Sequence, residues 1–260
     1  MTLPADRGNR LSVDADAAIV LRRPLAMVLI LTAVAGAMDA QDFRAFGVFT
    51  ANQAGNLVLV WLRLDADPGQ VWLSVFSLVG CAVGIAGVLA LRRWVPWFTS
   101  SPGTRGLLVL AASLLGVTAL AGAVFLGREV PADPRLLTLG SEAWFAAGVS
   151  VSSSALALAV LATVFTMVGH AKAPVISITG PFVDSIRYGA ADLLYRDEGW
   201  NRLWRAAIGF PVAWTVGAAV SALMPVGRGA VAGSGVVIVV AIALLARRVN
   251  PDTAAPGRTV

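Results

Sequence analysis

GAMDAQDFRAFGVFTANQAGNLVL, residues 36–59, is the stretch that decides the fold. Polar side chains stand here between runs that are apolar enough to enter a bilayer: Asp39, Gln41, Asp42, Arg44, Asn52, Gln53 and Asn56. An Asp or Arg at the centre of a membrane helix costs about 2.5 to 3.5 kcal/mol, whereas a Leu or Val contributes only about 0.3 to 0.6 kcal/mol. Because polar groups kept at such depth usually serve function, we interpret the stretch as the polar interior of a polytopic membrane protein.

The composition also indicates a membrane protein. The 260 residues are 57% hydrophobic and 13% charged, whereas soluble domains carry about 25% charged residues. Eight apolar segments can be distinguished, at 25–43, 46–62, 71–91, 106–126, 143–168, 174–195, 203–224 and 229–246. Most approach the roughly 20 residues that a membrane-spanning helix needs. We predict an all-α transmembrane bundle of about eight spans. Seven is the alternative, because 46–62 and 229–246 are short enough to be broken, tilted or re-entrant.

The segments fall into two halves of four. Residues 25–126 form the first predicted repeat and residues 143–247 the second, joined by a cytoplasmic loop at 127–142. Residues 1–24 and 248–260 are predicted to be disordered cytoplasmic ends, because they lack a sustained apolar pattern. Since an even number of predicted crossings separates equivalent segments, we expect the two repeats to be parallel.

Small residues recur in the third segment of each half. Gly80, Gly84 and Gly87 are spaced along one helix, as are Gly209, Ala213 and Gly217 along the other. Such spacing lets helices approach closely in lipid, so we assign these residues to helix packing. The alternative is that Gly and Ala are simply frequent in membrane helices.

Charge gives the expected orientation. The net charge is +5, from 19 arginines and a single lysine among the basic residues. The arginines are dispersed at segment ends, which indicates membrane orientation rather than nucleic-acid binding. Placing both termini in the cytoplasm puts most of them on that side, although Arg92, Arg93 and Arg105 of the third loop fall on the other. The single cysteine, Cys81, excludes a disulfide framework within one chain.

Two groups in the first half could form a site. Asp39 and Asp42, three residues apart, share a helix face and suit a cation or proton site; alternatively the helix ends near Ala40, which leaves Asp42 and Arg44 as a solvated pair. Amides follow in a segment whose start is predicted to unwind: Asn52, Gln53 and Asn56. Such interruptions line sites in transporters, but the amides could instead only cross-link helices.

The second half offers a matching group. Thr179 precedes Gly180 and Pro181, and the proline should kink its helix. Asp184 and Arg187 are three residues apart and can neutralise each other. They are read either as a structural ion pair or as ligand-facing groups.

No enzyme motif is present. The sequence contains no Gly-x-Ser-x-Gly, His-Glu-x-x-His, Walker loop or Cys-x-x-Cys. We therefore expect no catalytic residue, no metal and no cofactor.

The motif at Gly36–Ala40, then Phe43 and Phe49–Asn56, resembles the YoaK family of bacterial membrane proteins, domain of unknown function 1275. A second Thr-Gly, here Thr179-Gly180, belongs to the same pattern. Ala54 replaces the family's signature threonine. The resemblance implies a multi-pass protein of the bacterial inner membrane and leaves its activity open.

Together these features predict a transporter-like protein for a small solute or ion. Its substrate-binding residues would be Asp39, Asn52, Gln53, Asn56, Thr179, Asp184 and Arg187. The alternative is a non-transporting membrane scaffold or regulator whose buried polar groups only fix helix packing. The expected partners are the lipid bilayer and the solute or ion, without nucleic acid; a homo-oligomer is compatible with the sequence.

Overall fold

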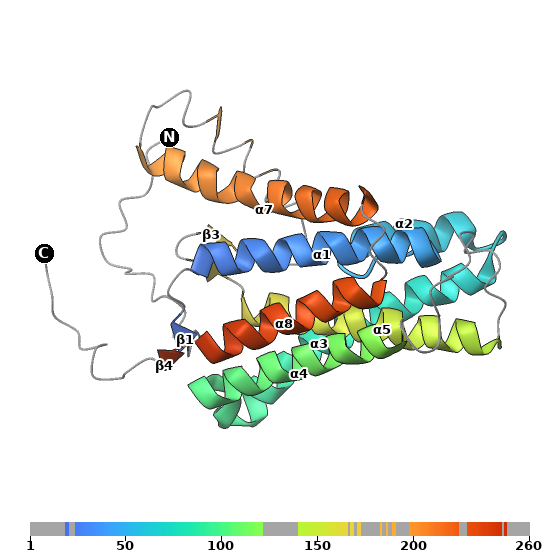
Figure 1. Ribbon diagram of the computed structural model, residues 1–260, viewed down its shortest axis with the longest axis horizontal. Coiled ribbons are helices and arrows are strands. Elements are labelled where there is room, and N and C mark those ends of the chain that lie inside the picture. The colour runs from blue at the N-terminus through green and yellow to red at the C-terminus, as the bar shows by residue number, and fades with distance from the viewer. Residues whose placement is uncertain are drawn as a thin grey trace, which may run out of the picture.

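A computed structural model of the chain shows a helical bundle (Figure 1). It describes residues 19–20, 24–121, 140–165, 167–168, 171–172, 183, 186, 189–190, 198–223, 228–245 and 247–248. The α-helices with bounds in these ranges are α1 (Pro24–Phe46), α2 (Gln53–Arg63), α3 (Pro68–Trp94), α4 (Ser101–Leu120), α5 (Glu142–Val164), α7 (Glu198–Leu223) and α8 (Arg228–Leu245). A 3-10 turn, η1 (Pro96–Thr99), links α3 to α4.

Four of these helices, α1, α3, α4 and α5, are long and apolar enough to cross a membrane. Shorter apolar stretches lie within α7 at Ala207–Leu223 and within α8 at Ala230–Leu244. The prediction of a helical membrane protein is therefore confirmed at this level.

Local capping explains where several helices begin. Asp67 accepts a hydrogen bond from the Gln70 N–H at 3.1 Å, and Pro68 fills the first position of α3. Ser141 accepts one from the Trp144 N–H at 3.1 Å at the start of α5. A side-chain cap of this kind contributes about 1 kcal/mol, and proline at the first position lacks only an N–H that would have no helical partner.

Side-chain contacts fix the relative directions of the helices. The Gln41 and Ser221 side chains meet where α1 and α7 run parallel, as Figure 1 shows. A Cβ added at Gly80 of α3 would lie 2.7 Å from the Ser152 carbonyl oxygen, and one at Gly84 would lie 2.9 Å from that of Leu156, so α3 and α5 are also parallel. In Figure 1, α4 is antiparallel to α5, and α8 is antiparallel to α1.

Short strands sit at one end of the bundle (Figure 1). β1 (Ile19–Val20) pairs antiparallel with β4 (Arg247–Arg248), which joins the start of α1 to the end of α8. β2 (Met167–Val168) pairs with β3 (Ala171–Lys172). The first pair falls at the inner edges of the ends predicted to be disordered, and Pro24, the last residue of the N-terminal one, begins α1. The rest of 1–23 and of 248–260, and nearly all of the predicted loop 127–142, lie outside the described residues.

The chain between α1 and α3 turns back instead of crossing the bundle. α2 has 11 residues, which makes it about 16 Å long, half the thickness of the hydrocarbon. α2 starts beside Asp39, because the backbone N–H groups of residues 50–52 donate hydrogen bonds to the Asp39 carboxylate. Its last residue, Arg63, donates a hydrogen bond to the Gly47 carbonyl just after α1. We call residues 47–63 the re-entrant hairpin. Segment 46–62 therefore folds back along the end of α1, which is compatible with the re-entrant alternative that its short length suggested.

This turn reverses the expected relation between the halves. α3 begins at the end of the bundle where α1 finishes, because Gln70 lies beside Gly47. Consequently α5 runs opposite to α1, α7 opposite to α3, and α8 opposite to α4. The prediction of parallel repeats is wrong, since it counted the hairpin as a crossing. Predicted segment 174–195 falls almost entirely outside the described residues.

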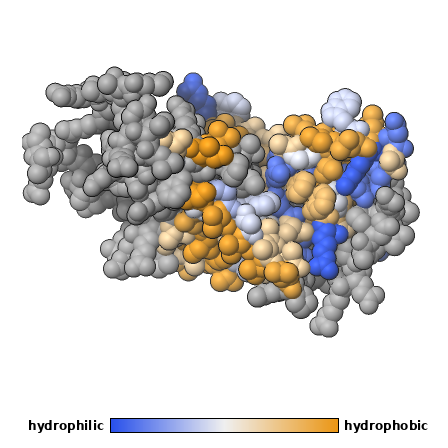
Figure 2. Space-filling view, turned by 90° about the horizontal axis from the view of Figure 1, so that it is seen from above, coloured by the Kyte–Doolittle hydropathy of each residue, from blue (hydrophilic) through white to orange (hydrophobic). Residues whose placement is uncertain are grey.

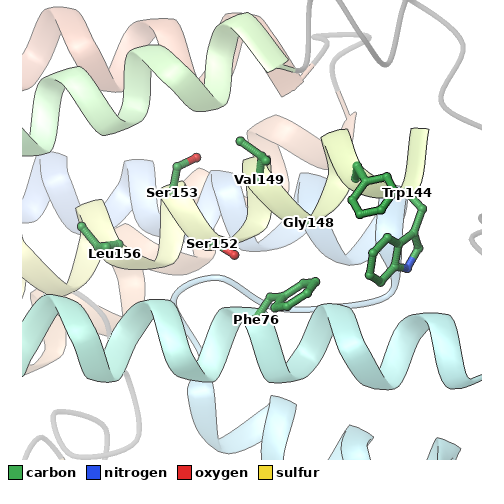
Figure 3. A pocket seen from close by; sticks show the side chains of 8 residues that line it. Phe76, Trp144, Gly148, Val149, Ser152, Ser153 and Leu156 are labelled. Carbon is green, nitrogen blue, oxygen red and sulfur yellow. The ribbon is translucent and has the colours of Figure 1, made fainter. Parts of the chain in front are cut away.

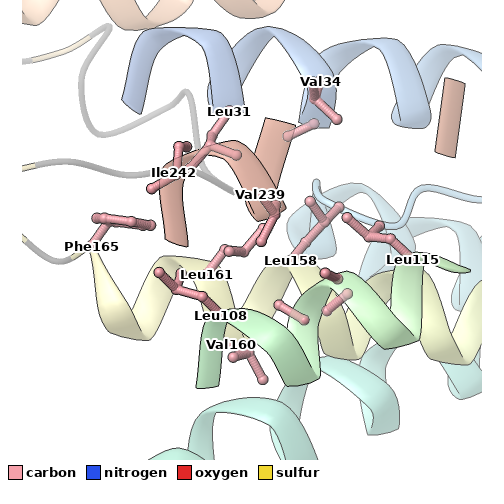
Figure 4. Packing of buried hydrophobic residues seen from close by; sticks show 14 of the residues in the cluster. Leu31, Val34, Leu108, Leu115, Leu158, Val160, Leu161, Phe165, Val239 and Ile242 are labelled. Atoms are coloured by element: carbon pink, nitrogen blue, oxygen red, sulfur yellow. The ribbon is translucent and has the colours of Figure 1, made fainter. Parts of the chain in front are cut away.

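The core is apolar and lies where α1, α4, α5 and α8 meet (Figure 4). Leu31, Leu108, Leu115, Leu158 and Val239 are at most 1% exposed there. Large hydrophobic side chains also cover the outside of the bundle, and Figure 2 shows them over much of one face, with hydrophilic residues gathered mostly towards one end. An apolar exterior of this kind suits lipid rather than water.

Candidate functional site

The carboxylate of Asp39 is the centre of the buried polar groups. It is fully buried on α1 and accepts three backbone hydrogen bonds from consecutive residues. The N–H groups of Thr50 and Ala51 donate to Oδ1 at 2.8 and 2.6 Å, and the N–H of Asn52 donates to Oδ2 at 3.0 Å. These donors come just before α2, where the helix dipole favours negative charge. The negative charge that stabilises the start of α2 therefore comes from α1, through the carboxylate of Asp39.

Two features let the hairpin double back. Gly47 has φ of +68°, a left-handed conformation that glycine adopts without strain. The rings of Phe43 and Phe49 stack with their centroids 4.7 Å apart, and this contact holds the segment after Gly47 against the last turns of α1. Within a bilayer such irregular backbone is tolerated only where protein satisfies it or where it lines an aqueous cavity.

A second carboxylate lies one helical turn away. Asp42 is fully buried, and its Oδ2 accepts a hydrogen bond from the Thr50 hydroxyl at 2.7 Å. α1 continues to Phe46, so the interpretation of Asp42 as part of a solvated pair after a helix end at Ala40 is wrong. Asp39 and Asp42 do share one face, and that face holds the hairpin.

The amides complete the network. Asn56 binds both backbone groups of Phe49: its Oδ1 accepts from the N–H at 2.9 Å and its Nδ2 donates to the carbonyl at 2.6 Å. Gln53 donates to the Thr50 carbonyl at 2.8 Å and to the Ser77 hydroxyl at 3.1 Å. Ser77, on α3, also donates to the Phe49 carbonyl at 2.7 Å. The hairpin is thus tied to α1 by carboxylates and to α3 by a hydroxyl and an amide.

Family comparison adds one finding. A family model described as "Protein of unknown function (DUF1275)" matches residues 27–246. The chain belongs to the DUF1275 family. Comparisons with curated proteins and with solved structures gave no match.

In this member of the DUF1275 family, the structure places the four site residues predicted in the first half in one cluster. Asp39 and Asn56 are fully buried, and Asn52 and Gln53 are half-buried at the start of α2. Asn52 caps that helix by accepting from the Gly55 N–H at 3.4 Å. Thr179, Asp184 and Arg187, predicted for the second half, lie outside the described residues.

Residues that the sequence analysis did not select are equally involved in the cluster. Thr50 bridges the two carboxylates, since its N–H binds Asp39 and its hydroxyl binds Asp42. Ser77 lies in an apolar run of α3 and joins Gln53 to the hairpin backbone. The available signal for Ser77 was a hydroxyl within an apolar run, and the signal for Thr50 was its place directly after Phe49 in the family motif.

The proposed packing residues of this DUF1275 protein differ in their surroundings. Gly80 and Gly84 lie against α5, and a Cβ at Gly217 would be 1.9 Å from the Ala33 carbonyl oxygen of α1. Gly209 faces the Leu29 side chain, with 3.2 Å to its nearest atom, and Ala213 is half-buried on the same helix. Gly87 has no atom of the described residues within 4 Å of an added Cβ, so its assignment to helix packing stays a prediction.

The groups that the cluster could offer to a ligand are oxygen atoms and amides. Among the described residues, no group of three or more His, Cys, Asp or Glu side chains could hold a metal ion. The chemistry on offer is therefore hydrogen bonding and the binding of positive charge, by two carboxylates and several backbone carbonyls buried at the depth where the hairpin turns.

Proposed function

We propose that the protein is a secondary-transporter-like carrier of a small solute or ion. The observation that carries this proposal is the re-entrant hairpin, whose non-helical backbone at residues 47–52 is brought by Asp39 into the membrane-embedded part of α1. Broken or re-entrant helices at this depth form substrate and ion sites in transporters. Asp39, Asn52, Gln53 and Asn56 would line the site in the first half.

Opposed helix directions support the same function. α1 packs on α7 as α5 packs on α3, and α4 packs on α8. The same pairs result when each helix is replaced by its equivalent in the other half: α1 by α5, α3 by α7 and α4 by α8. Each helix runs in the direction opposite to that of its equivalent. We infer an inverted repeat with its pseudo-two-fold axis in the membrane plane, the arrangement on which alternating access relies in many carriers. Thr179, Asp184 and Arg187 would then contribute from the equivalent segment of the second half.

Basic residues support the proposed orientation in the bacterial inner membrane. Among the described residues, those in elements at the end of the bundle where β1 and β4 meet are Arg92, Arg93, Arg105, Lys172, Arg202, Arg205, Arg247 and Arg248. The opposite end has Arg44, Arg63 and Arg228. Because basic residues favour the cytoplasmic side, we place both termini in the cytoplasm. The re-entrant hairpin would move the third-loop arginines to that side. It would also put Glu142, at the start of α5, on the other side, so the prediction of a cytoplasmic loop that ends at Glu142 is not compatible with this orientation.

A second function is favoured by one observation. All three backbone donors around Asp39 are bound by its two oxygens, and Asn56 and Gln53 are also bound within the cluster. A membrane scaffold or regulator needs no more than such a fixed network.

Uptake by proteoliposomes distinguishes the two functions. The panel consists of radiolabelled amino acids, sugars, carboxylates and monovalent ions, tested with the purified protein, with Asp39→Asn and with Asp184→Asn. The control is Asp65→Asn, the same chemical change at an exposed position in the turn after α2. If the protein is a transporter, the parent and Asp65→Asn should take up a solute above the level of empty liposomes. Asp39→Asn and Asp184→Asn should lose this uptake while still eluting as a single folded species. Absence of uptake across the panel by the folded parent, or uptake unchanged in Asp39→Asn, would favour the scaffold.

A further inference from the structure

The outer face of α5 carries an apolar groove apart from the hairpin. Its volume is about 410 Å³, within the usual range of ligand pockets. Phe76 of α3 forms one wall, and α5 supplies the rest, including Trp144, Gly148, Val149, Ser152 and Leu156 (Figure 3). Val149 is 53% exposed, so the groove opens outward from the bundle.

The groove has the direction and depth of one lipid chain. Trp144 is in the first turn of α5, at the end of the helix, and Leu156 is 12 residues further on. At the rise of a helix this separation is about 18 Å along the membrane normal, which takes the groove from the interface past the centre of the leaflet. Gly148 keeps it open, because a Cβ there would lie 3.2 Å from the Phe76 ring.

The surroundings indicate what fills the groove. The neighbouring exposed side chains on α3 and α5 are also apolar, with Trp72, Val79, Val83 and Phe145 between 50 and 58% exposed. In a membrane-spanning helix this face meets acyl chains, and an empty groove would leave its walls without contact atoms. Trp144 lies at the interfacial end of the groove, in the first turn of α5, and indole rings favour the headgroup level of a bilayer, where a glycerolipid carries its ester groups.

We propose that this groove is a specific site for one acyl chain of a glycerophospholipid, with the ester region at Trp144 and the chain passing Gly148 towards Leu156. The bound lipid would stay with the protein through purification, because it fills a formed groove rather than a flat surface.

Native mass spectrometry of the detergent-purified protein, titrated with palmitoyl-oleoyl phosphatidylethanolamine, tests this site. Gly148→Leu fills the groove, and its matched control is Gly87→Leu on the adjacent helix, where an added Cβ would meet no atom of the described residues within 4 Å. We expect a single lipid adduct on the parent and on Gly87→Leu, and about a tenfold weaker adduct on Gly148→Leu, since excluding about two methylene groups from contact has that effect.

Equal adducts on both glycine variants, with both eluting as folded species, would overturn the site. So would a parent that loses its lipid and appears as a dimer whose interface Gly148→Leu disrupts, because a second copy would then occupy the groove. A diazirine-bearing phospholipid gives an independent readout: its crosslinks should map to residues 144–156 of α5, and crosslinks confined to other helices would contradict the assignment.

Discussion

Replacing Asp39 with asparagine tests whether this carboxylate holds the re-entrant hairpin in place. Oδ1 accepts the Thr50 and Ala51 N–H groups, and Oδ2 accepts that of Asn52. An asparagine side chain of the same size has one acceptor oxygen and an amide that can only donate on its other side. The variant therefore loses one charge-assisted hydrogen bond and turns the other two into neutral bonds.

The structure gives the expected size of this effect. Hydrogen bonds to charged groups contribute about 1.5 to 3 kcal/mol each, and neutral ones about 1 kcal/mol. Losing one and weakening two lowers the free energy of unfolding by about 3 kcal/mol or more, which is about 6 to 12 °C in Tm for a protein of this size. Asp39→Ala removes every acceptor and leaves three buried N–H groups unpaired, so it should lower the stability further.

The chain carries its own reporter for this measurement. Cys81 is the single cysteine and is 7% exposed, so a fluorogenic maleimide reacts as the bundle unfolds on heating. Asp65→Asn, with an exposed side chain, is the control and should leave Tm within about 1 °C, since surface substitutions change stability by less than about 0.5 kcal/mol. Equal Tm values for Asp39→Asn and Asp65→Asn would refute the view that the carboxylate anchors the hairpin.

Three further substitutions test the packing around the site, the first by the yield of folded protein and the other two by the same thermal assay. Gly217→Ala should prevent normal assembly, because its Cβ would collide with the Ala33 carbonyl oxygen. Gly233→Ala, where an added Cβ would meet no described atom within 4 Å, should assemble as the parent does; equal yields of folded protein would contradict this. Gly47→Ala should lower stability more than Gly140→Ala. Both positions have positive φ, which costs an alanine about 1 to 2 kcal/mol, but among the described side chains only those of Gln70 and Arg63 come within 3 Å of an added Cβ, and both lie at Gly47. Ser221→Ala removes the hydroxyl that joins α7 to α1 and should lower stability by about 1 kcal/mol; no change would mean that this contact is dispensable.

Sequence patterns predicted the helices well because lipid makes a strong demand on composition. The run at 71–91 lies within α3, which extends to Pro68–Trp94, and 143–168 contains nearly all of α5. Asp39 and Asn56 could be predicted as buried polar groups for the same reason, since neither is tolerated facing acyl chains.

The path of the chain after α1 could not be predicted in this way. Asp39 binds backbone N–H groups, and every residue except proline offers one, so its partners leave no mark in the sequence. The 17 residues of 46–62 are as apolar as a short span, and only the contacts of Asp39 and Arg63 show that α2 returns to the side from which it came. That one error in counting crossings reversed the predicted relation between the two halves.

The most direct test of the re-entrant hairpin is the side of the membrane on which its far end lies. Single cysteines at the exposed positions Asp65→Cys and Ala230→Cys, in a Cys81→Ala background, are labelled in intact cells with an impermeant maleimide, and Thr99→Cys serves as the marker of the opposite face. The structure predicts that residues 65 and 230 react from the same side and residue 99 from the other. Labelling of residues 65 and 230 from opposite sides would show that α2 crosses the membrane and would contradict the account.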